Sequence, residues 1–110
     1  MGYTIRGTEV EADDEGFLLE ADYSREAALA IAAAEGIELS DPHWQVIEAL
    51  REMFRDQGQI HNFCNLVKDF DERFPGHDWK KELYDLFPTQ PGRQACRIAG
   101  LPKPFGKGGY

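Results

Sequence analysis

The sequence predicts a mostly helical α+β fold: a small N-terminal antiparallel meander sheet packed on an array of about five helices, with a flexible C-terminal arm. Two features predict it. In residues 1–20, short runs of strand-forming residues alternate with turn residues, whereas residues 24–99 carry apolar side chains at helical spacing. A chain of 110 residues has room for one domain of ordinary size, so we expect a single domain over residues 1–110.

The expected sheet comes first in the chain. The runs Tyr3–Arg6, Glu9–Ala12 and Phe17–Glu20 have the composition of strands, and the residues between them have the composition of turns. Three short antiparallel strands have one face to bury, so helices must cover that face.

Helix signals begin at Ser24, a residue type that often caps helix N-termini. The Ala-rich run Arg25–Ala34 follows, and Gly36 is placed to end that helix. A second helix is expected after Ser40, where a cap residue precedes a proline in the first turn, and Gly58 ends it. The apolar residues of this second helix fall on one face: Trp44, Ile47, Leu50, Met53 and Phe54.

Three shorter helices complete the array. The third is expected over about 59–71, and the fourth lies between the cap residue Asp78 and Pro88. The fifth is short and runs over 91–99. Residues 100–110 are rich in Gly and Pro and have no periodicity, so they are expected to form the flexible arm.

Charge divides the chain at residue 85. The sequence has 12 basic and 20 acidic residues and a formal net charge of −8, and every acidic residue lies at or before Asp85. The segment after it contains cations alone: Arg93, Arg97, Lys103 and Lys107. Because residues 1–85 are acidic, this part of the chain does not belong to a protein that binds nucleic acid through its net positive charge. The cationic C-terminal end is expected to dock on an acidic partner.

A reducing, cytoplasmic location is expected. Two cysteines are too few for the disulfide framework of a small secreted domain. The N-terminus lacks the apolar segment of a signal peptide, and no apolar run approaches the length of a membrane span. The pattern also contains no complete set of zinc ligands and no phosphate-binding loop, so neither a metal nor a cofactor is expected.

The two cysteines have different surroundings in the sequence. Cys96 is flanked by Arg93 and Arg97, and nearby cations favour the reactive thiolate. From spacing alone, however, the leading interpretation is a small apolar residue packed against the helical body. Cys64 follows His61 by three residues, but two ligands do not make a structural zinc site. Packing in the core or at its boundary is therefore expected for Cys64.

A helix-turn-helix is a further interpretation of residues 41–71. The would-be recognition helix carries Lys68 as its only cation, beside Asp69 and Asp71. Phosphate attraction by such a helix would be weak. A DNA-binding regulator is therefore kept as an alternative, not as the leading hypothesis.

The chain resembles the family of the dissimilatory sulfite reductase γ-subunit DsrC and the sulfur-relay protein TusE, nearly from end to end. The similar segments are DEGFL, AEGIELSDPHWQVIEALREMF, LVKDF, LYDLFP and, most specifically, PGRQACRIAGLPKP. The resemblance implies the sheet-and-helix fold described above. It also implies a sulfur-trafficking protein that carries sulfur on arm cysteines and inserts its arm into the active sites of partner enzymes. Expected partners are sulfite-reductase-like, heterodisulfide-reductase-like or sulfur-relay proteins; neither nucleic acid nor a membrane is expected.

In this family the full pattern has one cysteine before IAGLPKP and a second at the penultimate position, and TusE-like members keep the second. Here Cys96 matches the first, but Gly109 is penultimate and Lys107 stands about where the second would align. The resemblance therefore assigns the sulfur-carrying or redox thiol to Cys96. It assigns partner binding to six residues: Arg93, Arg97, Leu101, Pro102, Lys103 and Pro104. The missing cysteine leaves open a non-catalytic paralogue that regulates or binds partners without relaying sulfur.

Overall fold

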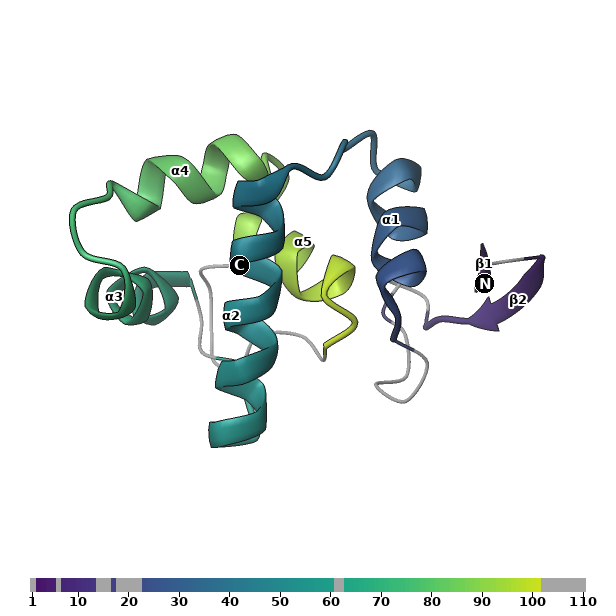
Figure 1. The fold of residues 1–110 in the computed structure, drawn as a ribbon, viewed down its shortest axis with the longest axis horizontal. Helices are drawn as coiled ribbons and strands as arrows, with labels where there is room; N and C mark the ends of the chain where they lie inside the picture. Colours follow the sequence, from purple (N-terminus) through teal and green to yellow (C-terminus); the bar gives the residue numbers. More distant parts are fainter. Residues whose placement is uncertain (1, 6, 14–16, 18–22, 61–62, 102–110) are drawn as a thin grey trace.

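The fold was analysed in a computed structural model, which describes residues 2–5, 7–13, 17, 23–60 and 63–101. Two strands and five helices follow one another along these residues (Figure 1): β1 (Gly2–Ile5), β2 (Thr8–Glu11), α1 (Arg25–Ala34), α2 (Asp41–Gln57), α3 (Phe63–Arg73), α4 (Trp79–Leu86) and α5 (Pro91–Ile98). The mostly helical α+β class is confirmed. No helix among the described residues is long and apolar enough to cross a membrane.

β1 and β2 form an antiparallel hairpin in which Tyr3 pairs with Val10 and Ile5 with Thr8. Gly7 takes the left-handed conformation that the tight turn requires, with a φ of +77°. The hairpin packs against α1 and lies at one end of the molecule (Figure 1). Of the third predicted strand, all but Phe17 lies outside the described residues.

The predicted limits of the first two helices are confirmed. Ser24 caps α1 by accepting a hydrogen bond from the Ala27 amide at 3.0 Å. Ser40 precedes α2, and Gly58 ends that helix with a φ of +74°. Inside the start of α2, the Nδ1 atom of the buried His43 accepts the Ser40 amide at 3.1 Å. Its Nε2 atom therefore donates to the Leu86 carbonyl at 2.9 Å, which joins α2 to the end of α4.

The last helix of the chain is the centre of the fold. Although α5 has only eight residues, it packs against α1, α2, α3 and α4 (Figure 1). Six of its residues are buried: Pro91, Gly92, Gln94, Ala95, Cys96 and Ile98. The flexible arm was expected to begin at residue 100, but Gly100 and Leu101 are buried as well. The packed body therefore extends at least to Leu101, because this apolar side chain completes the core.

Gly100 should be the least replaceable glycine among those described with positive φ. Its φ is +70°, and a Cβ atom added there would lie 2.5 Å from Cδ1 of Tyr23. Gly58 has a similar φ of +74°, but a Cβ atom there meets nothing within 4 Å. We therefore expect Gly100→Ala to lower the free energy of unfolding by at least about 1 kcal/mol more than Gly58→Ala, because only the first adds a clash to the backbone strain. Urea unfolding of both variants measures this difference, and equal losses would contradict the close approach of Tyr23.

Candidate functional site

The family-matched thiol lies inside the protein. Cys96 is on the buried face of α5, has no exposed surface and is a free thiol. Burial raises the pKa of this thiol to about 12. Of the two interpretations of Cys96 from the sequence, the packed core residue is therefore the one that the structure shows, and removal from water is the cause of the raised pKa. In the folded body Cys96 is protonated and closed to reagents.

The C-terminal turn of α5, residues 96–101, is fastened to α2 by one arginine. The Arg51 guanidinium donates from Nη1 to the Ala99 carbonyl at 2.7 Å. The same guanidinium lies 3.8 Å from the ring centroid of Tyr23, the ring that also faces Gly100. A charge-assisted bond to a helix-end carbonyl satisfies a group that the helix itself leaves unpaired. Arg51 therefore fixes the turn that contains Cys96 against α2.

A second attachment joins α5 to the end of α1. Glu35 Oε1 accepts a hydrogen bond from Gln94 Nε2 at 3.2 Å and forms an ion pair with Arg97 Nη1. Both charged side chains are mostly buried, with 18% of Glu35 and 19% of Arg97 exposed. The pairing is incomplete, because the buried atoms Glu35 Oε2 and Arg97 Nε have no hydrogen-bond partner among the described residues. Such atoms keep a desolvation cost that water would relieve if the turn opened.

The residues predicted to bind a partner are therefore divided. Arg97 is engaged by Glu35 of its own chain, and Leu101 is buried in the core. Arg93 is partly exposed. Pro102, Lys103 and Pro104 lie outside the described residues. Sequence inspection missed Glu35 and Arg51, because each is more than 40 positions from its partner on α5 and no local pattern links them.

The second cysteine has the opposite environment. Cys64 is a free, exposed thiol on α3, so the expected packing in the core or at its boundary is wrong. Its neighbour Phe63 takes the buried position instead. His61, which precedes Cys64 by three residues, lies outside the described residues. Within the described part of the chain, no group of three or more His, Cys, Asp or Glu side chains is placed to hold a metal ion.

Comparison with known proteins decides the family. The sequence matches the family described as "DsrC like protein" over residues 4–106. The chain belongs to the DsrC-like family. This DsrC-like chain is 43% identical over 102 residues to sulfurtransferase TusE of Salmonella paratyphi A, across 91% of this chain and 94% of the relative.

Solved structures agree with the family assignment. The NMR structure of Allochromatium vinosum DsrC superposes with a TM-score of 0.83 and 36% sequence identity, over 97% of this chain and 99% of that chain. The crystal structure of the oxidized γ-subunit of the dissimilatory sulfite reductase (DsrC) from Archaeoglobus fulgidus has a TM-score of 0.81 and 33% identity over the same shares. These likenesses support a sulfur-relay or sulfur-trafficking protein and give the helix-turn-helix alternative no support.

Proposed function

We propose that this DsrC-like protein relays sulfur by docking its C-terminal end on a partner protein, and that Cys96 carries sulfur once the C-terminal turn of α5 has opened. The observation that carries this proposal is the complete burial of the family-matched thiol, in a turn that Arg51 fastens to α2. A buried thiol with a raised pKa neither attacks a sulfur donor nor loses sulfur to solvent. Opening therefore controls when the thiol reacts.

Local opening of this turn is physically reasonable. It is the last turn of the last described helix, so it can separate without breaking a helix on both sides. Terminal segments open with free energies below that of global unfolding. The buried, unpartnered atoms of Glu35 and Arg97 lower the cost further, because water solvates them in the open state. A partner that binds the cationic end more tightly when the turn is open would favour the open state by mass action.

The sulfur-transfer step conserves atoms and electrons. The Cys96 thiolate attacks the terminal sulfur of a donor persulfide, and a new sulfur–sulfur bond forms on Cys96. The sulfur–sulfur bond of the donor breaks, and the donor leaves as a thiolate. The proton of Cys96 passes to solvent when the turn is open, and the product is a Cys96 persulfide with no net oxidation.

The partner is proposed to be another sulfur-relay protein or a sulfite-reductase-like or heterodisulfide-reductase-like protein. Support comes from the relatives, which are named sulfurtransferase TusE and γ-subunit of dissimilatory sulfite reductase. A cytoplasmic location fits two free thiols, because a reducing compartment keeps them unpaired.

Persulfide loading tests the proposal. In Cys64→Ser protein, Cys96 is the remaining thiol, and intact mass after incubation with glutathione persulfide reports sulfur gained there. Adding Arg51→Ala removes a charge-assisted bond that contributes roughly 1.5–3 kcal/mol, so loading should accelerate at least about tenfold. Gly58→Ala in the same background is the matched control, since it strains the end of α2 but leaves the bond from Arg51 to Ala99 in place. Equal acceleration by both would contradict the role of the turn.

The burial of Cys96 also favours a second function, a docking protein that does not carry sulfur. In that case Arg51→Ala would expose Cys96 to iodoacetamide, yet no sulfur would be gained from the persulfide. Binding to a partner would then be the same for the wild type and Cys96→Ala. Sulfur gained by the opened variant excludes this alternative.

A further inference from the structure

A hollow of about 420 Å³ lies between α3 and α4. Its lining combines two aromatic rings, one aliphatic side chain, one thiol and two ammonium groups: Phe63, Tyr84, Val67, Cys64, Lys68 and Lys80. Apolar walls with a few polar groups are typical of binding sites. We propose that this hollow docks an acidic segment of a partner protein, with one large apolar side chain of that segment seated in the hollow and its carboxylates at the two lysines.

Charge complementarity is the first argument. Lys68 and Lys80 come from different helices and meet at one hollow, and no described residue forms an ion pair with either. Other cations of the body are engaged: Lys81 with Asp85, and Arg73 with Glu52. Two cations that line one hollow and pair with no described residue attract carboxylates, so the partner segment is expected to be acidic.

Two other hollows of the described body differ from it in charge. One, of about 340 Å³, is lined by Asp41, Glu48 and Glu52 with no cation. Another, of about 490 Å³, mixes Glu48 and Glu52 with two arginines of α2. The hollow between α3 and α4 is therefore the one of these three that presents positive charge alone, on a body in which acidic residues predominate.

The apolar part of the hollow is preformed and exposed. Tyr84 is 47% exposed, one of two large hydrophobic residues with this exposure among those described. The rings of Phe63 and Tyr84 contact edge to face, with their centroids 5.3 Å apart, and this contact joins α3 to α4. Exposed tyrosines in rigid settings are frequent anchors of protein interfaces. An apolar side chain entering the hollow would therefore cover surface that now faces water, without rearranging the helices.

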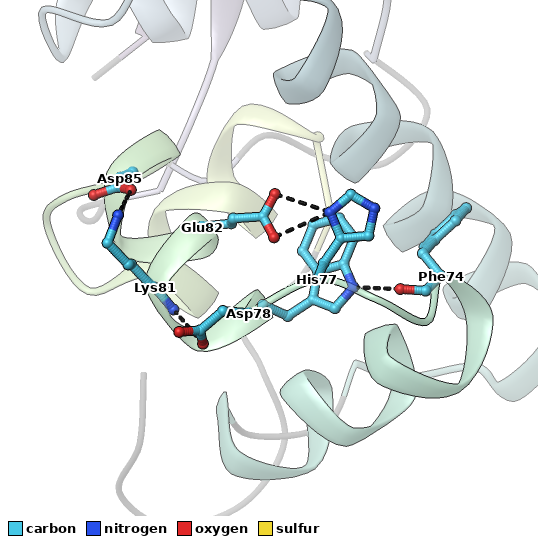
Figure 2. Close-up of polar contacts among 7 residues, drawn as sticks. Phe74, His77, Asp78, Lys81, Glu82 and Asp85 are labelled. Carbon is cyan, nitrogen blue, oxygen red and sulfur yellow. Dashed lines mark hydrogen bonds and ion pairs between the residues drawn. The ribbon is translucent and has the colours of Figure 1, made fainter.

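The turn that joins α3 to α4 is held by specific bonds, as Figure 2 shows. The Trp79 indole donates to the Phe74 carbonyl at 2.9 Å, and His77 contacts the Glu82 carboxylate at 3.1 Å. Lys81 points to Asp85 on the next turn of α4, 3.1 Å away. Lys81 does not line the hollow, so it provides a matched control on the same helix as Lys80.

The test uses a short synthetic peptide with a central leucine flanked by glutamates, titrated by isothermal calorimetry. We expect saturable binding that weakens with salt and falls at least about tenfold in the Lys68→Glu, Lys80→Glu double variant, with Lys81→Glu unchanged. The bound peptide should also slow alkylation of Cys64, which lines the hollow. Circular dichroism confirms that each variant is folded.

Several outcomes would overturn the proposal: no binding, equal binding of a peptide with lysines in place of glutamates, or equal binding to the double variant. Analytical ultracentrifugation tests a different occupant. A wild-type dimer that becomes monomeric with Tyr84→Ser would show that a second copy of this chain occupies the hollow, and this would also overturn the proposal. The lining of the hollow includes neither Cys96 nor any other residue of the C-terminal turn. Failure here would therefore leave the sulfur-carrying role of Cys96 untouched, and the reverse also holds.

Discussion

Cys96 should react with iodoacetamide at least about a thousandfold more slowly in the folded protein than in the unfolded chain. The thiolate is the attacking species, and burial raises the pKa of Cys96 from 9.0 to about 12. At neutral pH that shift lowers the thiolate fraction about a thousandfold, because each pKa unit is a factor of ten. Packing of α5 against the other helices leaves Cys96 with no exposed surface and slows the reaction further.

Peptide mapping by mass spectrometry measures both cysteines in one sample. Cys64 is exposed and serves as the internal control, so its alkylation rate should differ by less than about tenfold between the folded and unfolded protein. In urea both cysteines should label fully. Equal alkylation rates of Cys96 and Cys64 in the folded protein would contradict the burial of Cys96.

Alkaline pH should destabilise the protein through Cys96. The folded-state pKa is above the unfolded value, so the contribution of this thiol to stability is complete below pH 9 and is lost as the pH rises through about 12. As the pH rises, the unfolded chain loses the Cys96 proton at a lower pH than the folded protein does. Deprotonation therefore stabilises the unfolded state and lowers the free energy of unfolding. The expected loss is about 1.4 kcal/mol at pH 10 and approaches about 4 kcal/mol near pH 12.

Urea unfolding of the wild type and Cys96→Ala between pH 8 and pH 10.5 measures this loss. Burial also raises the pKa of Tyr3 and Tyr23, so the wild-type curve alone combines several groups. Those groups are present in both proteins, and the difference between the two curves isolates Cys96. The stability gap between the wild type and the variant should narrow with rising pH, and a gap independent of pH would contradict burial of the thiol.

Much of the helical array could be predicted because its signals are local. Ser24 and Ser40 mark the starts of α1 and α2, and Gly58 marks the end of α2, since caps and left-handed glycines act within a few residues. The central position of α5 could not be predicted. Its sequence, PGRQACRI, looks like that of a short surface helix, and packing against four other helices buries it.

The chemistry of the candidate site was harder to predict than its position. The family-matched segment pointed to Cys96, but its closure depends on contacts across the chain, from Glu35 of α1 and Arg51 of α2. For Cys64 a better local signal existed. The buried face of α3 comprises Phe63, Leu66 and Phe70, and the residue after Phe63 is rotated off that face by the helical repeat.

The central claim is that Cys96 takes up sulfur only through opening of the C-terminal turn of α5. The most direct test compares three proteins that all carry Cys64→Ser: one with no further change, one with Arg51→Ala and one with Glu35→Gln. Persulfide loading and hydrogen exchange of the α5 amides are measured for each protein under the same conditions. We predict that each tenfold increase in the opening of α5 gives about a tenfold increase in the rate of loading. Loading that is equally fast in all three proteins, while α5 stays protected from exchange, would contradict the claim.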